Sequence, residues 1–166
     1  LESAAQDAQR RMAEEPERMR AFDARVEAIR VKVASAKDRL AENQNARRAI
    51  EKDVAMHQSR LSKFRDQLMS VKTNVDYQAV QKEIEFAQTE VKALEDRVLE
   101  RMLEADDLTA GATRVELELA AEQKAVDAER CALSAELTGL KQSVEGVTEQ
   151  RASVASDKAA LEKSIA

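Results

Sequence analysis

The chain contains little of what a compact globular core or a chemical site is made from. Its 166 residues include no Trp, one Tyr, three Phe, one His and one Cys. Domains of this length normally fill their cores with more aromatic side chains. A single cysteine, Cys131, excludes an internal disulfide and any cysteine-cluster zinc site within these residues. Nucleotide-binding, metalloprotease and serine-hydrolase motifs are also missing. The sequence therefore predicts no enzyme, no catalytic residue, no cofactor and no metal ligand.

Long apolar runs and an excess of positive charge are absent as well. No segment approaches the ~18–20 consecutive apolar residues of a membrane span, and none has the apolar core of a signal peptide. The formal net charge is −5 at pH 7, whereas nucleic-acid binding depends on a basic surface. We therefore expect a cytoplasmic chain that does not bind membranes, and nucleic-acid binding is not favoured for these residues.

What the sequence has in abundance is charged and helix-forming residues in a heptad pattern. Charged residues make up 36% of the chain, against three Gly and one Pro, a composition typical of long helices and coiled coils. Apolar residues recur in alternating steps of three and four from Phe22 to Val71, with Asn43, Arg47 and His57 as polar exceptions. From Tyr77 to Leu161 every seventh residue is apolar. Such runs are typical of the coiled-coil seam, the row of positions along which two helices face each other.

The two runs are separated by a break at residues 72–76, Lys-Thr-Asn-Val-Asp. Asn and Asp favour turns, and we expect Asp76 to cap the second helix. If the turn centres on Asn74, apolar residues of the first run face apolar residues of the second, for example Leu68 and Val80. The sequence therefore predicts an all-α fold, a long antiparallel two-helix coiled-coil hairpin.

The predicted hairpin forms one domain, residues 1–166. Its first arm is 1–71, its turn 72–76 and its second arm 77–166. Residues 1–76 carry 16 basic and 13 acidic groups, and residues 77–166 carry 11 and 19. Arms of opposite charge favour pairing with each other.

Three irregularities are expected along the arms. Pro16 predicts a break at residues 14–16 with a short helix before it, because proline suits only the first turn of a helix. After about residue 120 the apolar stripe of the second arm moves by one residue, a stutter-like phase shift. Residues 148–166 have no partner in the predicted hairpin, which makes them the place for self-association or for contact with another segment.

Polar side chains interrupt the predicted seam at four positions: Asn43, Arg47, His57 and Arg101. The predicted register places Arg47 opposite Arg101. A buried Asn costs stability but fixes register, so one interpretation is a register device or a loosely packed layer. The other is a flexing point or a partner site. A lone histidine without a second ligand at suitable spacing predicts no metal site.

The predicted tip differs from the rest of the acidic chain, because residues 60–85 are near neutral and the tip carries Phe64, Tyr77 and Phe86, three of the four aromatic residues. Two interpretations stay open, structural packing of Phe64 and Tyr77 in the seam, or docking of a partner. The candidate partner-binding residues are Lys72, Asn74, Asp76, Tyr77, Gln78 and Lys82.

Residues 70–85 read SVKTNVDYQAVQKEIE, and LED and VLERM follow at 94–96 and 98–102. This stretch resembles the hairpin tip of the bacterial C4-type zinc-ribbon domain proteins, which typically read VKTNKEYQALQKEIE there. Glu-Glu-Pro-Glu-Arg-Met at 14–19 is similar to a proline-containing break in their first arm. Val75 stands where the family has a charged residue. The two CxxC pairs of the ribbon are absent, so zinc is expected only in a ribbon that this chain does not contain.

The resemblance implies a cytoplasmic regulatory adaptor. Some members of the family bind an alternative sigma factor and influence flagellar or secretion genes, and one binds a messenger RNA. We therefore expect a non-enzymatic protein-interaction adaptor, with a sigma factor or secretion and flagellar components as candidate partners. One alternative is a purely architectural spacer or dimerisation module. Another is RNA or DNA binding through the missing zinc ribbon.

Overall fold

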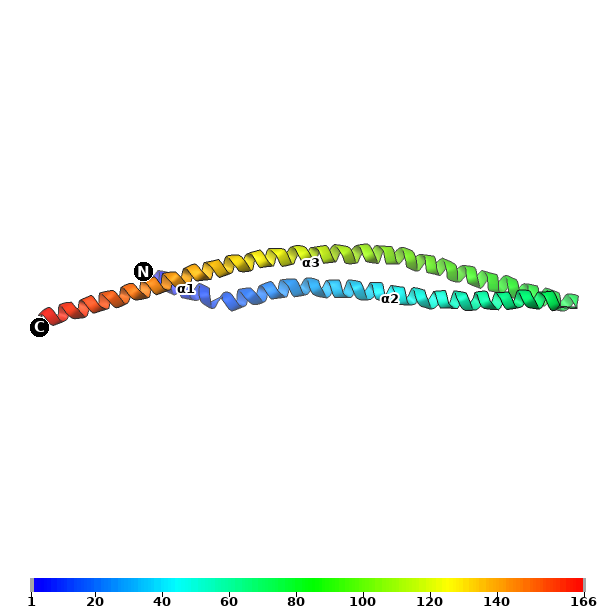
Figure 1. Ribbon diagram of the computed structural model, residues 1–166, viewed down its shortest axis with the longest axis horizontal. Coiled ribbons are helices and arrows are strands. Elements are labelled where there is room, and N and C mark those ends of the chain that lie inside the picture. Colours follow the sequence, from blue (N-terminus) through cyan, green and yellow to red (C-terminus); the bar gives the residue numbers. More distant parts are fainter. Residues whose placement is uncertain (1, 166) are drawn as a thin grey trace. The chain divides into compact units, whose positions relative to one another are not determined.

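The computed structural model describes residues 2–165, and the side chains of residues 5–164 (Figure 1). It contains three helices in this part of the chain, α1 (Glu2–Ala13), α2 (Glu15–Ser70) and α3 (Asn74–Ile165), and no strand. The predicted all-α fold class is confirmed. None of the described helices is long and apolar enough to cross a membrane.

Helices α1 and α2 part at Glu14, so the break predicted near Pro16 is confirmed. The Glu14 backbone N–H donates to the Arg10 carbonyl oxygen at 3.1 Å, and the Glu14 carbonyl accepts from the Arg18 N–H at 3.1 Å. Pro16 is the second residue of α2. A proline in the first turn costs little, because the backbone N–H that it lacks would have had no intrahelical partner.

The link between α2 and α3 is shorter than predicted and capped by a different residue. Only residues 71–73 lie outside the helices, whereas the turn was predicted at 72–76. The Thr73 hydroxyl accepts from the Asp76 backbone N–H at 3.1 Å and donates to the Asp76 carboxylate at 2.6 Å. Thr73 is therefore the N-cap. The prediction that Asp76 caps α3 was wrong. Asp76 lies in the first turn of α3, where a carboxylate interacts favourably with the helix dipole.

Burial along the helices follows the predicted seam. From Phe22 to Val71 the buried and half-buried residues keep the alternating three–four spacing, apart from half-buried Ala46 beside Arg47. Along α3 the same spacing holds up to Val126, apart from half-buried Glu90 and Gly111 beside seam residues, and the next seam residue is Arg130, four residues later again. The structure therefore places the predicted phase shift between Val126 and Arg130, where two steps of four follow each other.

The chain divides into two compact units, one of residues 1–30 with 117–166 and the other of residues 31–116. In the first unit the core consists of Phe22, Val26, Val126, Leu133 and Leu137, with Met12, Met19 and Leu119 packed against it. All side chains of residues 148–164 are exposed. The second unit contains the α2–α3 link. The single domain predicted for 1–166 stays a prediction.

Candidate functional site

Large apolar side chains are exposed around the α2–α3 link. Met69 is 89% exposed and Val75 is 78% exposed, and Tyr77 and Phe86 are exposed as well. Met69 is near the end of α2, whereas Val75 and Tyr77 belong to the first two turns of α3 and Phe86 lies further along the same helix. We call these four residues the tip patch. Their side chains have not been drawn into the seam, so apolar surface next to the link faces solvent.

The six predicted partner-binding residues are all exposed: Lys72, Asn74, Asp76, Tyr77, Gln78 and Lys82. Asp76 is occupied by the helix cap described above, and Tyr77 donates its backbone N–H to the Thr73 carbonyl oxygen at 3.0 Å. Tyr77 was also considered as a packing residue of the seam. Tyr77 is exposed, whereas Phe64 is half-buried in the seam.

The predicted site left out Met69, Val75 and Phe86, which provide most of the apolar surface of the tip patch. Each of them lies outside the heptad positions that form the seam. A large apolar residue out of phase with the seam is the signal that identifies them, because nothing in a two-helix pair buries it. Sequence reasoning gave weight to charged and turn residues instead.

A polar cluster centred on Glu104 occupies the seam of the second unit. Asn43 is 5% exposed, and its Nδ2 donates to Glu104 Oε2 at 2.7 Å. Arg101 Nη1 donates to the same oxygen at 2.6 Å. The buried Asn43 Oδ1 has no hydrogen-bond partner. Sequence reasoning missed Glu104, since it lies beside the seam and not in it.

The two arginines predicted to lie opposite each other, Arg47 and Arg101, each have a carboxylate on their own helix. Arg47 Nε lies 3.2 Å from Glu51 Oε1, an ion-pair distance without a hydrogen bond, and Arg101 pairs with Glu104. His57 is half-buried in the seam. Among the described residues no group of three or more His, Cys, Asp or Glu side chains is placed to hold a metal ion.

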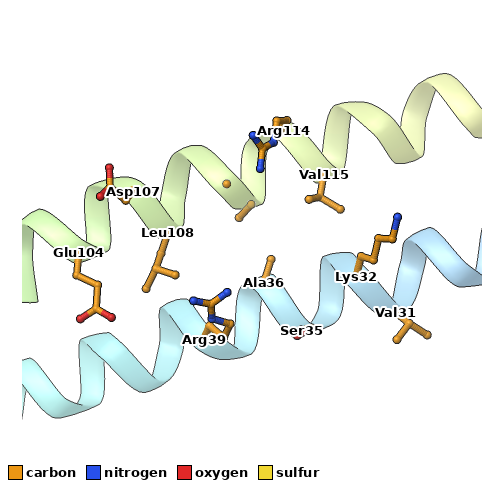
Figure 2. Close-up of a pocket in the computed structure, with 12 residues that line it drawn as sticks. Val31, Lys32, Ser35, Ala36, Arg39, Glu104, Asp107, Leu108, Arg114 and Val115 are labelled. Atoms are coloured by element: carbon orange, nitrogen blue, oxygen red, sulfur yellow. The ribbon is translucent and has the colours of Figure 1, made fainter.

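An open groove of about 700 Å³ runs along α2 and α3 in the second unit (Figure 2). Its floor includes the small residues Ala36, Gly111 and Ala112, and a Cβ added at Gly111 would meet no atom within 4 Å. Figure 2 shows Leu108 directed toward α2 and Asp107 directed away from it. Small side chains on facing helices leave this space unfilled. Its open shape suits contact with a side chain of another protein better than enclosure of a substrate.

Strong ion pairs hold the first unit together. Arg25 donates two hydrogen bonds to Glu129, at 2.8 and 3.0 Å, and one to Glu122 at 2.7 Å. Hydrogen bonding to Arg25 lowers the pKa of Glu129, and hydrogen bonds to Glu129 and Glu122 raise the pKa of Arg25. Both shifts favour the charged forms. These hydrogen-bonded ion pairs link α2 to α3 within the first unit.

Comparison of the chain with protein-family models, with curated proteins and with solved structures found no match. The resemblance to the zinc-ribbon domain proteins therefore stays a prediction that rests on residues 14–19 and 70–102 alone.

Proposed function

We propose that the chain is a non-enzymatic protein-interaction module that folds as an antiparallel coiled-coil hairpin and binds a protein partner with its tip. The pairing of α2 with α3 supports the hairpin. In the second unit Lys37 pairs with Glu116 at 2.7 Å, Asn43 with Glu104 at 2.7 Å and Gln58 with Glu95 at 3.3 Å. Residue numbers rise along α2 as those of the partners fall along α3, which is the order that an antiparallel pair requires.

The tip patch is the observation that supports partner binding. Exposed apolar residues scattered singly need no explanation, but four large ones between residues 69 and 86, on both sides of a turn, indicate a candidate interaction surface. Met is adaptable and Tyr combines an apolar ring with a polar group, and both are enriched at protein interfaces. Lys72 and Lys82, exposed nearby, supply a polar rim.

The class of partner follows from the resemblance. We propose a cytoplasmic adaptor that regulates transcription or secretion, with an alternative sigma factor or a secretion or flagellar component as partner.

A pull-down from lysate with the purified chain immobilised at one end tests whether the tip patch is the binding surface. Wild type, Met69→Ser/Val75→Ser and the control Val154→Ser are incubated with lysate, and retained proteins are identified by mass spectrometry. Val154 is exposed like the tip residues but belongs to the other unit. We expect a partner retained by wild type and the control but lost from the tip variant, with unchanged helicity by circular dichroism. Equal retention by all three would contradict binding through the tip.

An architectural spacer or dimerisation module is the second candidate function, and the exposed side chains of residues 148–164 favour it. In that case the chain self-associates and the tip variant retains the same proteins as wild type.

A further inference from the structure

A second apolar surface lies on α3, away from the link. Leu99, Met102 and Leu103 are 57%, 45% and 70% exposed. Residues three and four positions apart share one face of a helix, so the three side chains form one stripe within the second unit. We call it the Leu99 patch.

An apolar hollow of about 320 Å³ adjoins this stripe, lined by Glu51, Val54, Glu95, Val98 and Leu99. Val54 and Val98 are half-buried seam residues of α2 and α3, so the hollow lies where the two helices meet. Its two carboxylates have partners, since Glu51 pairs with Arg47 and Glu95 accepts a hydrogen bond from Gln58. Apolar lining residues beside carboxylates that already have partners are typical of protein interfaces.

The charge around the Leu99 patch is strongly negative. Residues 95–107 contain six acidic and two basic residues, a formal charge of −4 within about four helical turns. Arg101 pairs with Glu104, whereas Glu100, Asp106 and Asp107 form no ion pair with another residue in the described part of the chain. The surface therefore combines exposed apolar side chains with carboxylates that have no counter-charge.

The combination of exposed apolar side chains and unpaired carboxylates indicates which kind of partner binds this face of α3. A second copy of the chain that bound through the same patch would bring its own acidic segment against this one, and like charges across an interface are unfavourable. A groove along a helix pair accommodates an amphipathic helix, which presents apolar residues at three- and four-residue spacing. Basic residues on that helix would meet the unpaired carboxylates.

We propose that the Leu99 patch is a second docking site, which takes an amphipathic helix with a basic polar face from a protein partner. This site is separate from the tip patch and does not depend on it. The chain then holds two segments of partner protein at two places in the second unit.

Isothermal titration of the full chain with a synthetic helical peptide tests the proposal. The probe is about 18 residues long, with Leu at three- and four-residue spacing and Lys elsewhere. A second peptide has Glu in place of Lys. We expect the Lys peptide to bind and the Glu peptide not to bind. Leu99→Ser/Leu103→Ser should weaken binding at least about tenfold, and the matched control Met69→Ser/Val75→Ser should leave it unchanged.

A charge variant separates a docking site from general attraction to an acidic chain. Glu100→Gln/Asp106→Asn/Asp107→Asn should weaken binding of the Lys peptide, and the loss should shrink as salt is raised. The loss caused by Leu99→Ser/Leu103→Ser should persist at high salt. Circular dichroism checks that each variant folds, and Leu103→Ser alone, at the most exposed of the three positions, replaces the double variant if that one melts.

Two results would overturn the proposal. One is equal binding of the Lys peptide to wild type and to the Leu99→Ser/Leu103→Ser chain, which would mean attraction by charge alone. The other is a wild-type dimer in light scattering that the same substitutions dissociate, which would make a second copy the occupant. Neither result bears on the tip patch, whose variants are tested for retention of a partner.

Discussion

At Thr73 a single hydroxyl group determines where α3 begins. It bonds both the backbone N–H and the carboxylate of Asp76, so it satisfies a donor that the first turn of a helix leaves without a partner. Sequence reasoning located this break but chose Asp76 as the cap. Thr and Asp are both good N-caps, and which of them takes the position depends on where the chain leaves the helical conformation.

Replacing Thr73 by Ala should lower the free energy of unfolding by about 1 kcal/mol, the usual cost of losing an N-cap hydroxyl. Thr89→Ala is the matched control, because its hydroxyl bonds the Glu85 carbonyl oxygen within α3 and caps nothing. Ala is the better helix former, so Thr89→Ala should be neutral or slightly stabilising. Urea unfolding followed by circular dichroism measures both. A Thr73→Ala chain as stable as wild type would mean that α3 needs no cap there.

The polar cluster around Glu104 shows a limit of residue-level prediction. The heptad pattern identified Asn43 and Arg101 as irregular seam positions, and both are found there. It could not identify the carboxylate that they share, because several acidic residues flank the seam and only the packed geometry selects one. A seam position is set by periodicity, whereas a hydrogen-bond partner depends on the relative placement of two helices.

At the scale of the elements, periodicity predicted most of what the structure contains. The break at Glu14 and the phase shift of α3 both follow from the order of the residues, since proline and a displaced apolar stripe have direct consequences for a helix. The exposure of Met69 and Phe86 follows from the same pattern, but only when residues outside the seam are considered. The ion pairs of the first unit were not predictable, because the phase shift in α3 decides which carboxylates face Arg25.

The Arg25–Glu129 pair predicts an acid-sensitive part of the stability of the first unit. The bonds from Arg25 hold the pKa of Glu129 below its usual value of 4.5, so the folded chain binds this proton less readily than the unfolded chain. The contribution is complete above pH 4.5 and disappears as the pH falls through the lowered pKa. Glu129→Gln should therefore lower the melting temperature at pH 7, and the difference from wild type should shrink toward pH 3.

Glu145→Gln is the control for this measurement, because Glu145 is an exposed residue of the same helix and forms no ion pair with any other described residue. Its melting temperature should follow that of wild type at every pH. Since both groups of the Arg25–Glu129 pair are exposed, added salt should reduce the effect. A Glu129→Gln deficit that stays constant down to pH 3 would show that the carboxylate charge is not its origin.

At the scale of the whole molecule, the proposed hairpin presents both proposed partner-binding surfaces on a pair of long helices. The tip patch and the Leu99 patch both belong to the second unit, which also buries apolar seam residues such as Ile50, Leu61 and Val91. This arrangement suits the proposed adaptor, because the seam supplies stability while other faces of the same helices leave apolar side chains exposed.

Cross-linking tests whether α2 and α3 pair within one chain, which separates the hairpin from an architectural dimer. Gln58→Cys and Glu95→Cys are introduced together with Cys131→Ser, which removes the exposed native thiol. Because Gln58 and Glu95 are hydrogen-bonded in the structure, a short bis-maleimide should link the two cysteines within a monomer at every protein concentration.

Gln58→Cys with Glu116→Cys is the matched control, since Glu116 pairs with Lys37 instead, and no internal link should form. Mass spectrometry of the digested product identifies the linked residues. Cross-linked dimers that increase with concentration would show that the helices pair between chains, and the hairpin would then have to be abandoned.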